Sequence, residues 1–404
     1  MSEPNVVTID TYQDARDAYR EKQLRQALYD AGDVVMADVL VNLHGDEHRA
    51  RRRVENRLFR RDSNARYERD LFPPIVDETL APFVAAGHAE LVGLSHQMMM
   101  NLAAFTAGID RPRHTPEETL HLYSYMMRFI EGATLAHYTG DREAKRAEVA
   151  DALEAFDAEF LRPSIARRQH ELARLDAGAI TEDELPRDVL TVLLRNQDAL
   201  RLPSEVVLRE TCFYLLAGAH TSATAFVRTL DAIFSMQDVA PADAERARTD
   251  MAFLQRCVHE TVRLQPSSPV AMRWALDDIE LKGGQVVARG DMVVIDLNAV
   301  NRDPSVFGND ADRFDPSRAL PQGVAPWGLS FGLGMHACIG QELAVGVDDA
   351  ETTTEDDRLY GLVPVAVRAV LEAGGRPDPE HPARLDPESE RGYWADYPVV
   401  FSRP

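Results

Sequence analysis

One cysteine in a glycine-rich segment has the clearest chemistry in this sequence. Cys338 lies in FGLGMHACIGQELA, among Gly332, Gly334 and Gly340. Glycines allow tight turns and let a flat group approach the backbone. The helical pattern after Cys338 places the thiol near a helix N-terminus, which stabilises a thiolate. A sheltered thiolate beside backbone N–H donors suits a fifth ligand of haem iron, whereas the alternative for a lone cysteine is a buried structural role.

The same segment resembles the haem-binding loop of the cytochrome P450 family. That loop has an aromatic residue, glycines, a basic residue two positions before the cysteine and a glycine two positions after it. The matching residues here are Phe331, Gly332, Gly334, His336, Cys338 and Gly340. The resemblance implies that Cys338 ligates the iron of haem b. Cys212 and Cys257 lie within helical patterns, and for them we keep the structural interpretation.

A second segment, HETVRLQP (259–266), resembles helix K of that family. Glu260 and Arg263 are three residues apart, so their side chains can meet on one helix face. In the family such a pair is joined by an arginine from a later loop, and FDPSR supplies Arg318. A guanidinium can bind a carboxylate bidentately and fix the loop that leads to the haem ligand. We assign these three residues a structural role.

The two propionates of haem need polar or cationic partners. His48 and Arg52 are one helical turn apart in GDEHRARRR and resemble the propionate-binding pair of helix C. Arg273 and His336 match the other propionate contacts of the family. Any one of these residues, taken alone, is also consistent with a solvated charge.

The segment LLAGAHTSAT (215–224) resembles helix I, whose small residues open a groove over the haem. Ala217, Gly218 and Thr221 match it, and a hydroxyl at Thr221 can pass protons during oxygen chemistry. His220 stands where the family usually has an acidic residue. Histidine can relay protons near neutral pH, and it can equally be a helix histidine whose hydrogen bonds are satisfied elsewhere.

These matches favour a monooxygenase that inserts one atom of dioxygen into a small organic substrate. We expect mostly apolar pocket walls, and therefore a hydrophobic substrate. The expected wall residues are Phe213, Leu216 and Ala217, with Pro269, Val270 and Ala271 opposite. Two alternatives remain open: a peroxygenase that takes oxygen from hydrogen peroxide, and a haem sensor or carrier without turnover.

The electrons for such a reaction must come from another protein. The sequence has no G-x-G-x-x-G fingerprint and too few cysteines for an iron–sulfur cluster. The resemblance implies a ferredoxin and a ferredoxin reductase as donors. A stripe of arginines at helical spacing could steer an acidic partner, or could be a solvated basic face; it consists of Arg49, Arg53, Arg57 and Arg60.

The composition limits the protein's partners and its compartment. The 404 residues carry 66 acidic and 44 basic side chains, a net charge of -22 that argues against binding nucleic acid or anionic membranes. Three cysteines cannot form a disulfide framework, so we expect a reducing compartment. The N-terminus lacks a signal-peptide pattern and no apolar run could span a bilayer. We therefore expect a cytoplasmic protein.

The chain is predicted to be mostly α-helical with a small β region. Helical patterns cover 11–28, 48–61, 75–109, 115–138, 141–175, Ser204 to about Ser235, and 245–265. Alternating apolar residues and glycines predict short strands within 270–298 and near 398–401, with a loop over 301–330 between them. With no repeat and no linker, residues 1–404 are expected to form one domain of the P450 fold. Haem is expected between the central helix and the cysteine loop.

Two features depart from the family pattern. Only about 45 residues precede the helix C motif, so we expect a more open substrate entrance. An acidic run at 347–357 interrupts the helix that normally continues from the haem cysteine, and we expect it to form a solvated loop.

Overall fold

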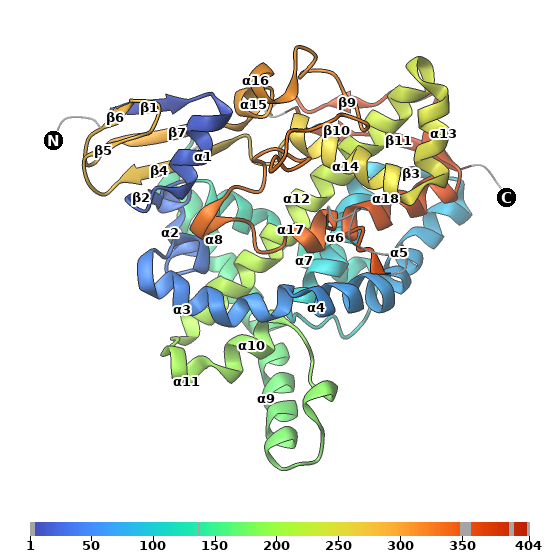
Figure 1. The fold of residues 1–404 in the computed structure, drawn as a ribbon. Helices are drawn as coiled ribbons and strands as arrows, with labels where there is room; N and C mark the ends of the chain where they lie inside the picture. Colours follow the sequence, from blue (N-terminus) through green and yellow to red (C-terminus); the bar gives the residue numbers. More distant parts are fainter. Residues whose placement is uncertain (1–4, 136–137, 348–356, 388–391, 402–404) are drawn as a thin grey trace. The chain divides into compact units, whose positions relative to one another are not determined.

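The computed structural model describes residues 5–135, 138–347, 357–387 and 392–401. Helices predominate and the strands are short, as the sequence predicts (Figure 1). The residues group into two compact units built from separate stretches of chain. Unit 1 holds Met1–Arg25, Asn64–Met98 and Thr221–Pro404, and unit 2 holds Gln26–Ser63 and Met99–His220. The expectation of a single domain over 1–404 stays a prediction.

Unit 1 contains the β structure. Its main sheet has the strand order β1-β7-β4-β2, in which β7 (Met292–Asp296) pairs in parallel with β1 (Val6–Ile9) and antiparallel with β4 (Val270–Ala275). A second sheet has the order β3-β11-β8, and β5–β6 and β10–β9 form two-stranded sheets. The other strands are β2 (Leu24–Gln26), β3 (His88–Glu90), β5 (Ile279–Glu280), β6 (Val286–Val287), β8 (Gly375–Pro377), β9 (Arg384–Leu385), β10 (Trp394–Asp396) and β11 (Pro398–Phe401). The strands predicted within 270–298 and near 398–401 are therefore confirmed.

Helix α1 (Tyr12–Arg20) packs on the main sheet of unit 1 (Figure 1). Thr11 caps it by accepting a hydrogen bond from the Asp14 N–H at 3.3 Å. The apolar face of α1 meets Val293 and Ile295 of β7 in one buried cluster. The other helical segments of unit 1 are η4 (Tyr67–Leu71, a π-helical turn), α5 (Phe72–Ala86), α13 (Pro241–Thr249), α14 (Met251–Leu264), α15 (Leu297–Val300), α16 (Pro304–Phe307), η8 (Gly334–His336), α17 (Gln341–Val345) and α18 (Leu362–Glu372).

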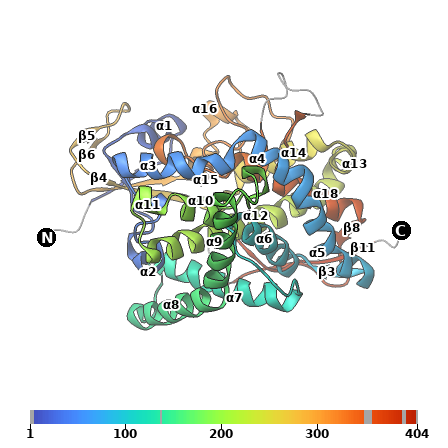
Figure 2. The same ribbon diagram turned by 90° about the horizontal axis from the view of Figure 1, so that it is seen from below.

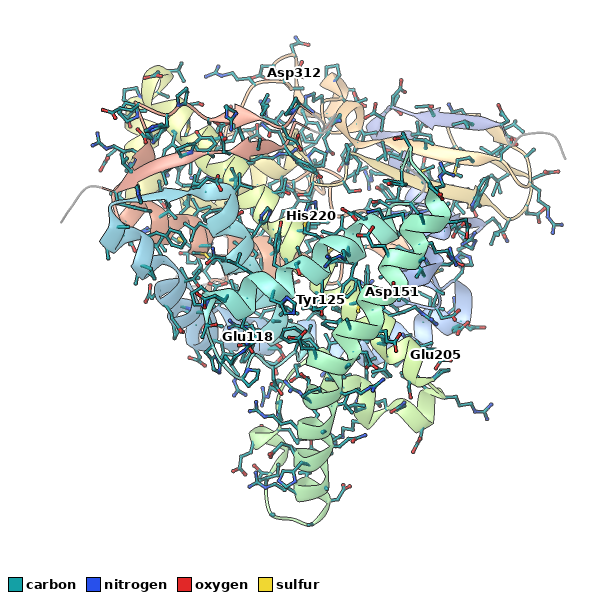
Figure 3. The ribbon with its side chains drawn as sticks, turned by 180° about the vertical axis from the view of Figure 1, so that it is seen from behind. Glu118, Tyr125, Asp151, Glu205, His220 and Asp312 are labelled. Carbon is teal, nitrogen blue, oxygen red and sulfur yellow. The ribbon has the colours of Figure 1, made fainter. Side chains whose placement is uncertain are left out.

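Unit 2 is helical. Its helices α7 (Pro116–Ala133) and α8 (Arg142–Phe156) lie side by side (Figure 2). Tyr125, labelled on α7 in Figure 3, packs edge-on against Phe156, which does the same with Phe129 at 5.3 Å between ring centroids. The remaining segments are η1 (Asp30–Gly32), α2 (Asp33–Met36), η2 (Leu40–Asn42), α3 (Gly45–Glu55), η3 (Asn56–Phe59), η6 (Asp157–Leu161), α9 (Arg162–Asp176), η7 (Glu182–Glu184), α10 (Val189–Arg195) and α11 (Gln197–Leu200). Three helices carry residues of both units: α4 (Arg61–Arg66), α6 (Leu91–Ala107) and α12 (Ser204–Val239).

Several predicted helix boundaries are wrong. The pattern at 11–28 is helical only to Arg20, because the chain then joins the main sheet as β2 and strand pairing overrides local propensity. The pattern at 75–109 is divided at Gly87, whose φ of +80° ends α5. The pattern at 245–265 is divided at Asp250, which caps α14 by accepting from the Phe253 N–H at 2.9 Å.

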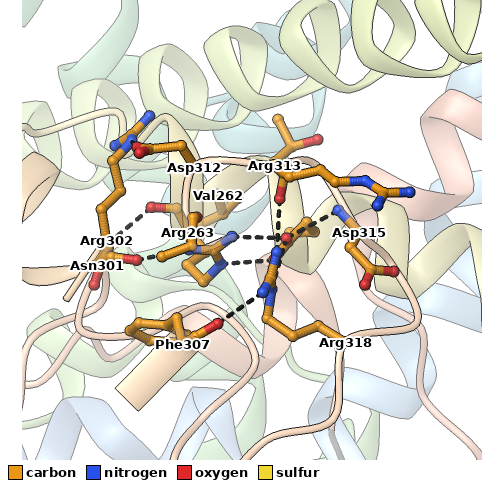
Figure 4. A network of polar contacts seen from close by, with 12 residues as sticks. Val262, Arg263, Asn301, Arg302, Phe307, Asp312, Arg313, Asp315 and Arg318 are labelled. Carbon is orange, nitrogen blue, oxygen red and sulfur yellow. Dashed lines mark hydrogen bonds and ion pairs between the residues drawn. The ribbon is translucent and has the colours of Figure 1, made fainter. Parts of the chain in front are cut away.

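The predicted contact between Glu260 and Arg263 is confirmed, and it is buried. Figure 4 shows the network of polar contacts around Arg263. Arg263 is 0% exposed and binds Glu260 bidentately at 2.6 and 2.7 Å. Its third nitrogen donates to the carbonyl oxygens of Asn301 at 2.6 Å and Ala311 at 2.9 Å. Arg318 donates to Glu260 at 3.3 Å, which completes the predicted triad. A buried guanidinium whose three nitrogens all have partners is stable only while every partner remains.

Replacing Arg263 should therefore unfold the protein or nearly so. Arg263→Ala leaves Glu260 charged and buried, and Arg263→Lys restores the charge but not the fork that reaches four acceptor atoms. We expect a loss of about 3–5 kcal/mol in the free energy of unfolding for the alanine variant. Denaturant titration of the soluble fraction measures it.

Arg302→Ala is the matched control, because Arg302 pairs with Asp312 at 2.9 Å in the same region but at the surface (Figure 4). An exposed pair contributes about 1 kcal/mol or less. Equal stability of the Arg263 and Arg302 variants would contradict the structural role of the triad.

Candidate functional site

Cys338 lies in a tightly turned loop of unit 1. Gly332 and Gly334 adopt φ values of +64° and +70°, which residues with a side chain rarely adopt. The Cys338 N–H donates to the Phe331 carbonyl oxygen at 2.8 Å and closes the loop. Cys338 is exposed, whereas Cys212 and Cys257 are completely buried. The residue that the sequence selects as an iron ligand is therefore the accessible cysteine.

The end of α1 supports this loop. A Cβ at Gly334 would lie 2.6 Å from the Tyr19 carbonyl oxygen, so only glycine fits there. Arg273 packs over the ring of Tyr19, 5.4 Å from its centroid. Burial raises the pKa of Tyr19 to about 12, although the charge of Arg273 opposes the shift. Sequence reasoning missed Tyr19; its only signal is its place on the apolar face of α1 with Tyr12.

A second support comes from α14. The ring of Phe331 meets Trp327 edge-on at 5.7 Å, and Trp327 meets His259 edge-on at 5.0 Å. His259 bonds the carbonyl oxygen of Val345 in α17 at 2.8 Å. Burial lowers the pKa of His259 to about 4, so the ring is neutral near pH 7 and its N–H donates to that carbonyl. The cysteine loop is thus braced before and after Cys338.

Asn301 connects the buried triad to the same loop. Its side-chain amide, 0% exposed, donates to the carbonyl oxygen of Arg263 at 3.0 Å and to the hydroxyl of Ser330 at 2.8 Å. Its side-chain oxygen accepts from the Leu329 N–H at 2.8 Å. The network at α14 therefore continues to the residue before Phe331. No pattern in the sequence marked Asn301 for this role.

The residues expected at the haem propionates fall into two pairs. Arg273 on β4 and His336 on η8 belong to unit 1, with Cys338. His48 and Arg52 lie one turn apart on α3 in unit 2. Burial, and then the charge of Arg52, lower the pKa of His48 to about 4. In either protonation state the His48 ring could donate an N–H to a propionate, and Arg52 would supply a fixed positive charge.

Helix α3 is fixed to α12 inside unit 2 by a charged cluster that the sequence did not reveal. Arg51 donates to Glu55 at 2.9 Å and forms an ion pair with Glu210 of α12. Tyr214 donates to Glu55 at 2.6 Å, and the Leu40 N–H donates to Glu210 at 2.9 Å. Burial and the neighbouring Glu55 raise the pKa of Glu210 well above its usual range. This cluster orients the helix that carries His48 and Arg52.

Helix α12 carries all the residues predicted on the central helix. Phe213, Ala217 and Thr221 follow one another at intervals of four and share one face. Gly218 and Thr221 are exposed, whereas Ser222, the residue after Thr221, is buried. His220 is half-buried on the same helix (Figure 3). Leu216 is buried, so its exposure does not test its predicted place in a pocket wall.

The four arginines of the predicted stripe lie at the surface of unit 2, but the predicted single helix is wrong: only Arg49 and Arg53 lie on α3, which ends at Glu55, while Arg57 lies in η3 and Arg60 follows it. All four side chains are exposed: Arg49, Arg53, Arg57 and Arg60. Arg49 pairs with Asp46 one turn away. Within the described part of the chain the other three arginines have no carboxylate partner. Most of the stripe is therefore available to an outside partner.

The predicted break in the helix after Cys338 is also observed. Helix α17 ends before Gly346, and α18 begins at Leu362. The Gln255 side chain holds the two stems together by donating to Val345 and Leu359 at 3.0 and 3.1 Å. Most of the acidic run, residues 348–356, lies outside the described residues.

The comparisons with known proteins concern the family and the fold. Residues 143–345, half of the chain, match the sequence model of the family described as Cytochrome P450. The chain belongs to the cytochrome P450 family. Its fold and its membership in a family of haem-binding oxidoreductases are thereby confirmed. The exposed thiol of Cys338, with Arg273 and His336 in the same unit, fits haem.

Individual relatives are distant. The putative cytochrome P450 133B2 of Xylella fastidiosa is 31% identical over 176 residues, 43% of this chain and 41% of that one, so the chain spans about two fifths of that relative's length. The cyclooctat-9-en-7-ol 5-monooxygenase of Streptomyces melanosporofaciens is 26% identical over 373 residues, 81% of this chain and 74% of that one. The crystal structure of P450BioI with an acyl carrier protein ligated to hexadec-9Z-enoic acid gives a TM-score of 0.75 at 18% identity, covering 98% of this chain and 92% of that one. This last likeness concerns the fold alone. Among the described residues no helix has the length and apolar character to cross a membrane.

Proposed function

We propose that the protein is a haem-thiolate monooxygenase that transfers one oxygen atom from O2 to a hydrophobic organic substrate. The observation that carries the proposal is the exposed Cys338 in its closed glycine loop, in the same unit as Arg273 and His336, the candidates for the propionates. When bound, haem b supplies oxygen activation, which electron donation from the cysteine thiolate favours. The work of the other residues is to bind, to orient and to deliver protons.

A hydrophobic substrate is supported by the proposed wall residues. These are Phe213, Leu216, Ala217, Pro269, Val270 and Ala271, none of which has a polar side chain. One relative points the same way by its name, which is that of a monooxygenase of cyclooctat-9-en-7-ol.

Proton delivery is assigned to Thr221, with His220 feeding it. Thr221 is exposed and its hydroxyl can hold a water or donate directly. His220 is the residue directly before it, and a histidine side chain can relay protons near neutral pH. Both lie on α12, so their spacing is fixed by a helix and not by a loop.

The ligand assignment is tested by the reduced, carbon monoxide-bound protein. Wild type should show the strongly red-shifted Soret band of a thiolate-ligated haem, and Cys338→His should lose that band. Cys212→Ala and Cys257→Ala are the matched controls, because both thiols are buried within helices, and both should keep it. A histidine-type spectrum from wild type would remove the basis of the proposed function.

The proton assignment is tested by the fate of consumed oxygen. Thr221→Ala should still consume O2 but release most of it as hydrogen peroxide. His220→Ala should do the same, while His220→Asp should keep part of the coupling to product. Unchanged coupling in His220→Ala would show that the histidine takes no part. If both alanine variants turn over normally with peroxide while wild type ignores ferredoxin, the protein is a peroxygenase instead.

A ferredoxin with its reductase is the proposed electron donor. The exposed arginine stripe supports it, because an acidic partner is attracted to such a face in an otherwise acidic protein. Arg53→Glu with Arg57→Glu should slow reduction by about tenfold or more at low salt. The wild-type rate should fall as salt rises, since exposed charges are screened beyond about 10 Å at 0.1 M ionic strength.

The double reversal Arg142→Glu with Arg174→Glu changes the net charge equally, on exposed residues of α8 and α9. It should leave the reduction rate near that of wild type. If both double variants slow reduction to the same extent, net charge and not the stripe steers the donor.

A further inference from the structure

The link between α14 and β4, residues 265–269, is held by side chains from elsewhere in unit 1. Carbonyl oxygens of three successive link residues accept hydrogen bonds from outside the link. Arg228 donates to Gln265 at 3.0 Å and to Pro266 at 3.4 Å. Tyr393 donates to the Ser267 carbonyl oxygen at 3.4 Å. A segment without regular backbone pairing depends on such partners for its position.

Ser267 also reaches back to the helix of the proposed proton donor. Its hydroxyl donates to the main-chain oxygen of Thr221 at 3.0 Å. Arg228 lies on the same helix, two turns after Thr221, and is 5% exposed. The link is thus bonded to α12 at two places along one helix.

Tyr393 contacts both Arg228 and the link. The Arg228 guanidinium lies over its ring, 5.2 Å from the centroid, while its hydroxyl holds the link. Beyond Ser267 the link is fixed again, because the Leu297 N–H donates to the Pro269 carbonyl oxygen at 2.9 Å. The short stretch from Ser267 to Pro269 is therefore fixed at both ends.

We propose that Arg228, Ser267 and Tyr393 form a clamp that sets substrate selectivity. The link leads directly into Pro269, Val270 and Ala271, so the clamp fixes the distance between this wall and Thr221. The three are positioning residues that act through the wall. A displacement of about 1 Å is enough to change which bond of a substrate is in reach. The inference rests on the proposed function, because the wall has meaning only beside a bound haem.

The test uses the haem-loaded, full-length protein and two ligands of haem iron. Imidazole needs little room, whereas 4-phenylimidazole carries a ring that must fit against the wall. Ser267→Ala and Tyr393→Phe each remove one hydroxyl of the clamp, and Tyr393→Phe keeps the ring over Arg228. We expect an unchanged Kd for imidazole and a Kd for 4-phenylimidazole altered about tenfold. Amide hydrogen exchange at residues 267–271 should also become about tenfold faster.

Tyr397→Phe is the matched control. Tyr397 donates to Asp231 of α12 at 3.0 Å, and within the described residues no hydrogen bond joins it to the link. Both readouts should stay at wild-type values in this variant. If Ser267→Ala and Tyr393→Phe give the same Kd ratio and exchange as Tyr397→Phe, the clamp does not exist.

Failure of the proposed function gives a different result. Wild type would then lack the thiolate spectrum with carbon monoxide, whatever the clamp variants do. The hydrogen exchange of the link needs no turnover, so it tests the clamp in either case. If Ser267→Ala does not fold, Tyr393→Phe carries the test alone.

Discussion

The requirement that a buried guanidinium keep all its partners determines the architecture around the cysteine loop. Arg263 has no contact with solvent, so its charge is stable only against Glu260 and two backbone oxygens. Those oxygens belong to Asn301 and Ala311, which fixes the loop after α15. Asn301 then binds Leu329 and the hydroxyl of Ser330. One ion pair thereby sets the chain direction just before the segment that carries Cys338.

Unit 2 shows the same principle with different residues. Arg51 is buried between Glu55 and Glu210, and Arg168 is buried between Asp110 and Asp188. In each case one arginine joins segments that are far apart in sequence. Buried ion pairs add little net stability over apolar contacts, but losing one partner is costly. They therefore select one arrangement of helices, which a site that must hold a rigid group requires.

The sequence was most informative where function requires a local pattern. The glycines around Cys338, the spacing of Glu260 and Arg263, and the strand at 398–401 are all short-range features, and all were predicted. Tyr19, Asn301 and Arg51 were missed because their roles depend on partners hundreds or tens of residues away. The strand at Leu24–Gln26 was mistaken for helix for the same reason, since only its pairing in the sheet distinguishes it. Arg51 is buried, whereas Arg49 and Arg53 on the same helix are exposed. The sequence alone does not distinguish a buried arginine from an exposed one.

Two separate sets of hydrogen bonds begin at the last turn of α14: one supports the loop of Cys338, and the other holds the proposed substrate wall. The carbonyl oxygen of Arg263 accepts from Asn301, on the path to the cysteine loop, whereas that of Gln265 accepts from Arg228, on the path to the wall. The hydrogen bonds described for the two paths come from different side chains, although the paths begin two residues apart. Mutations in the clamp can therefore move the wall without removing a partner from Arg263. Because the buried triad keeps α14 rigid, a change in the link is passed to the wall and not absorbed by the helix. Such an arrangement would let substrate preference change while the loop of Cys338 and its support stay constant.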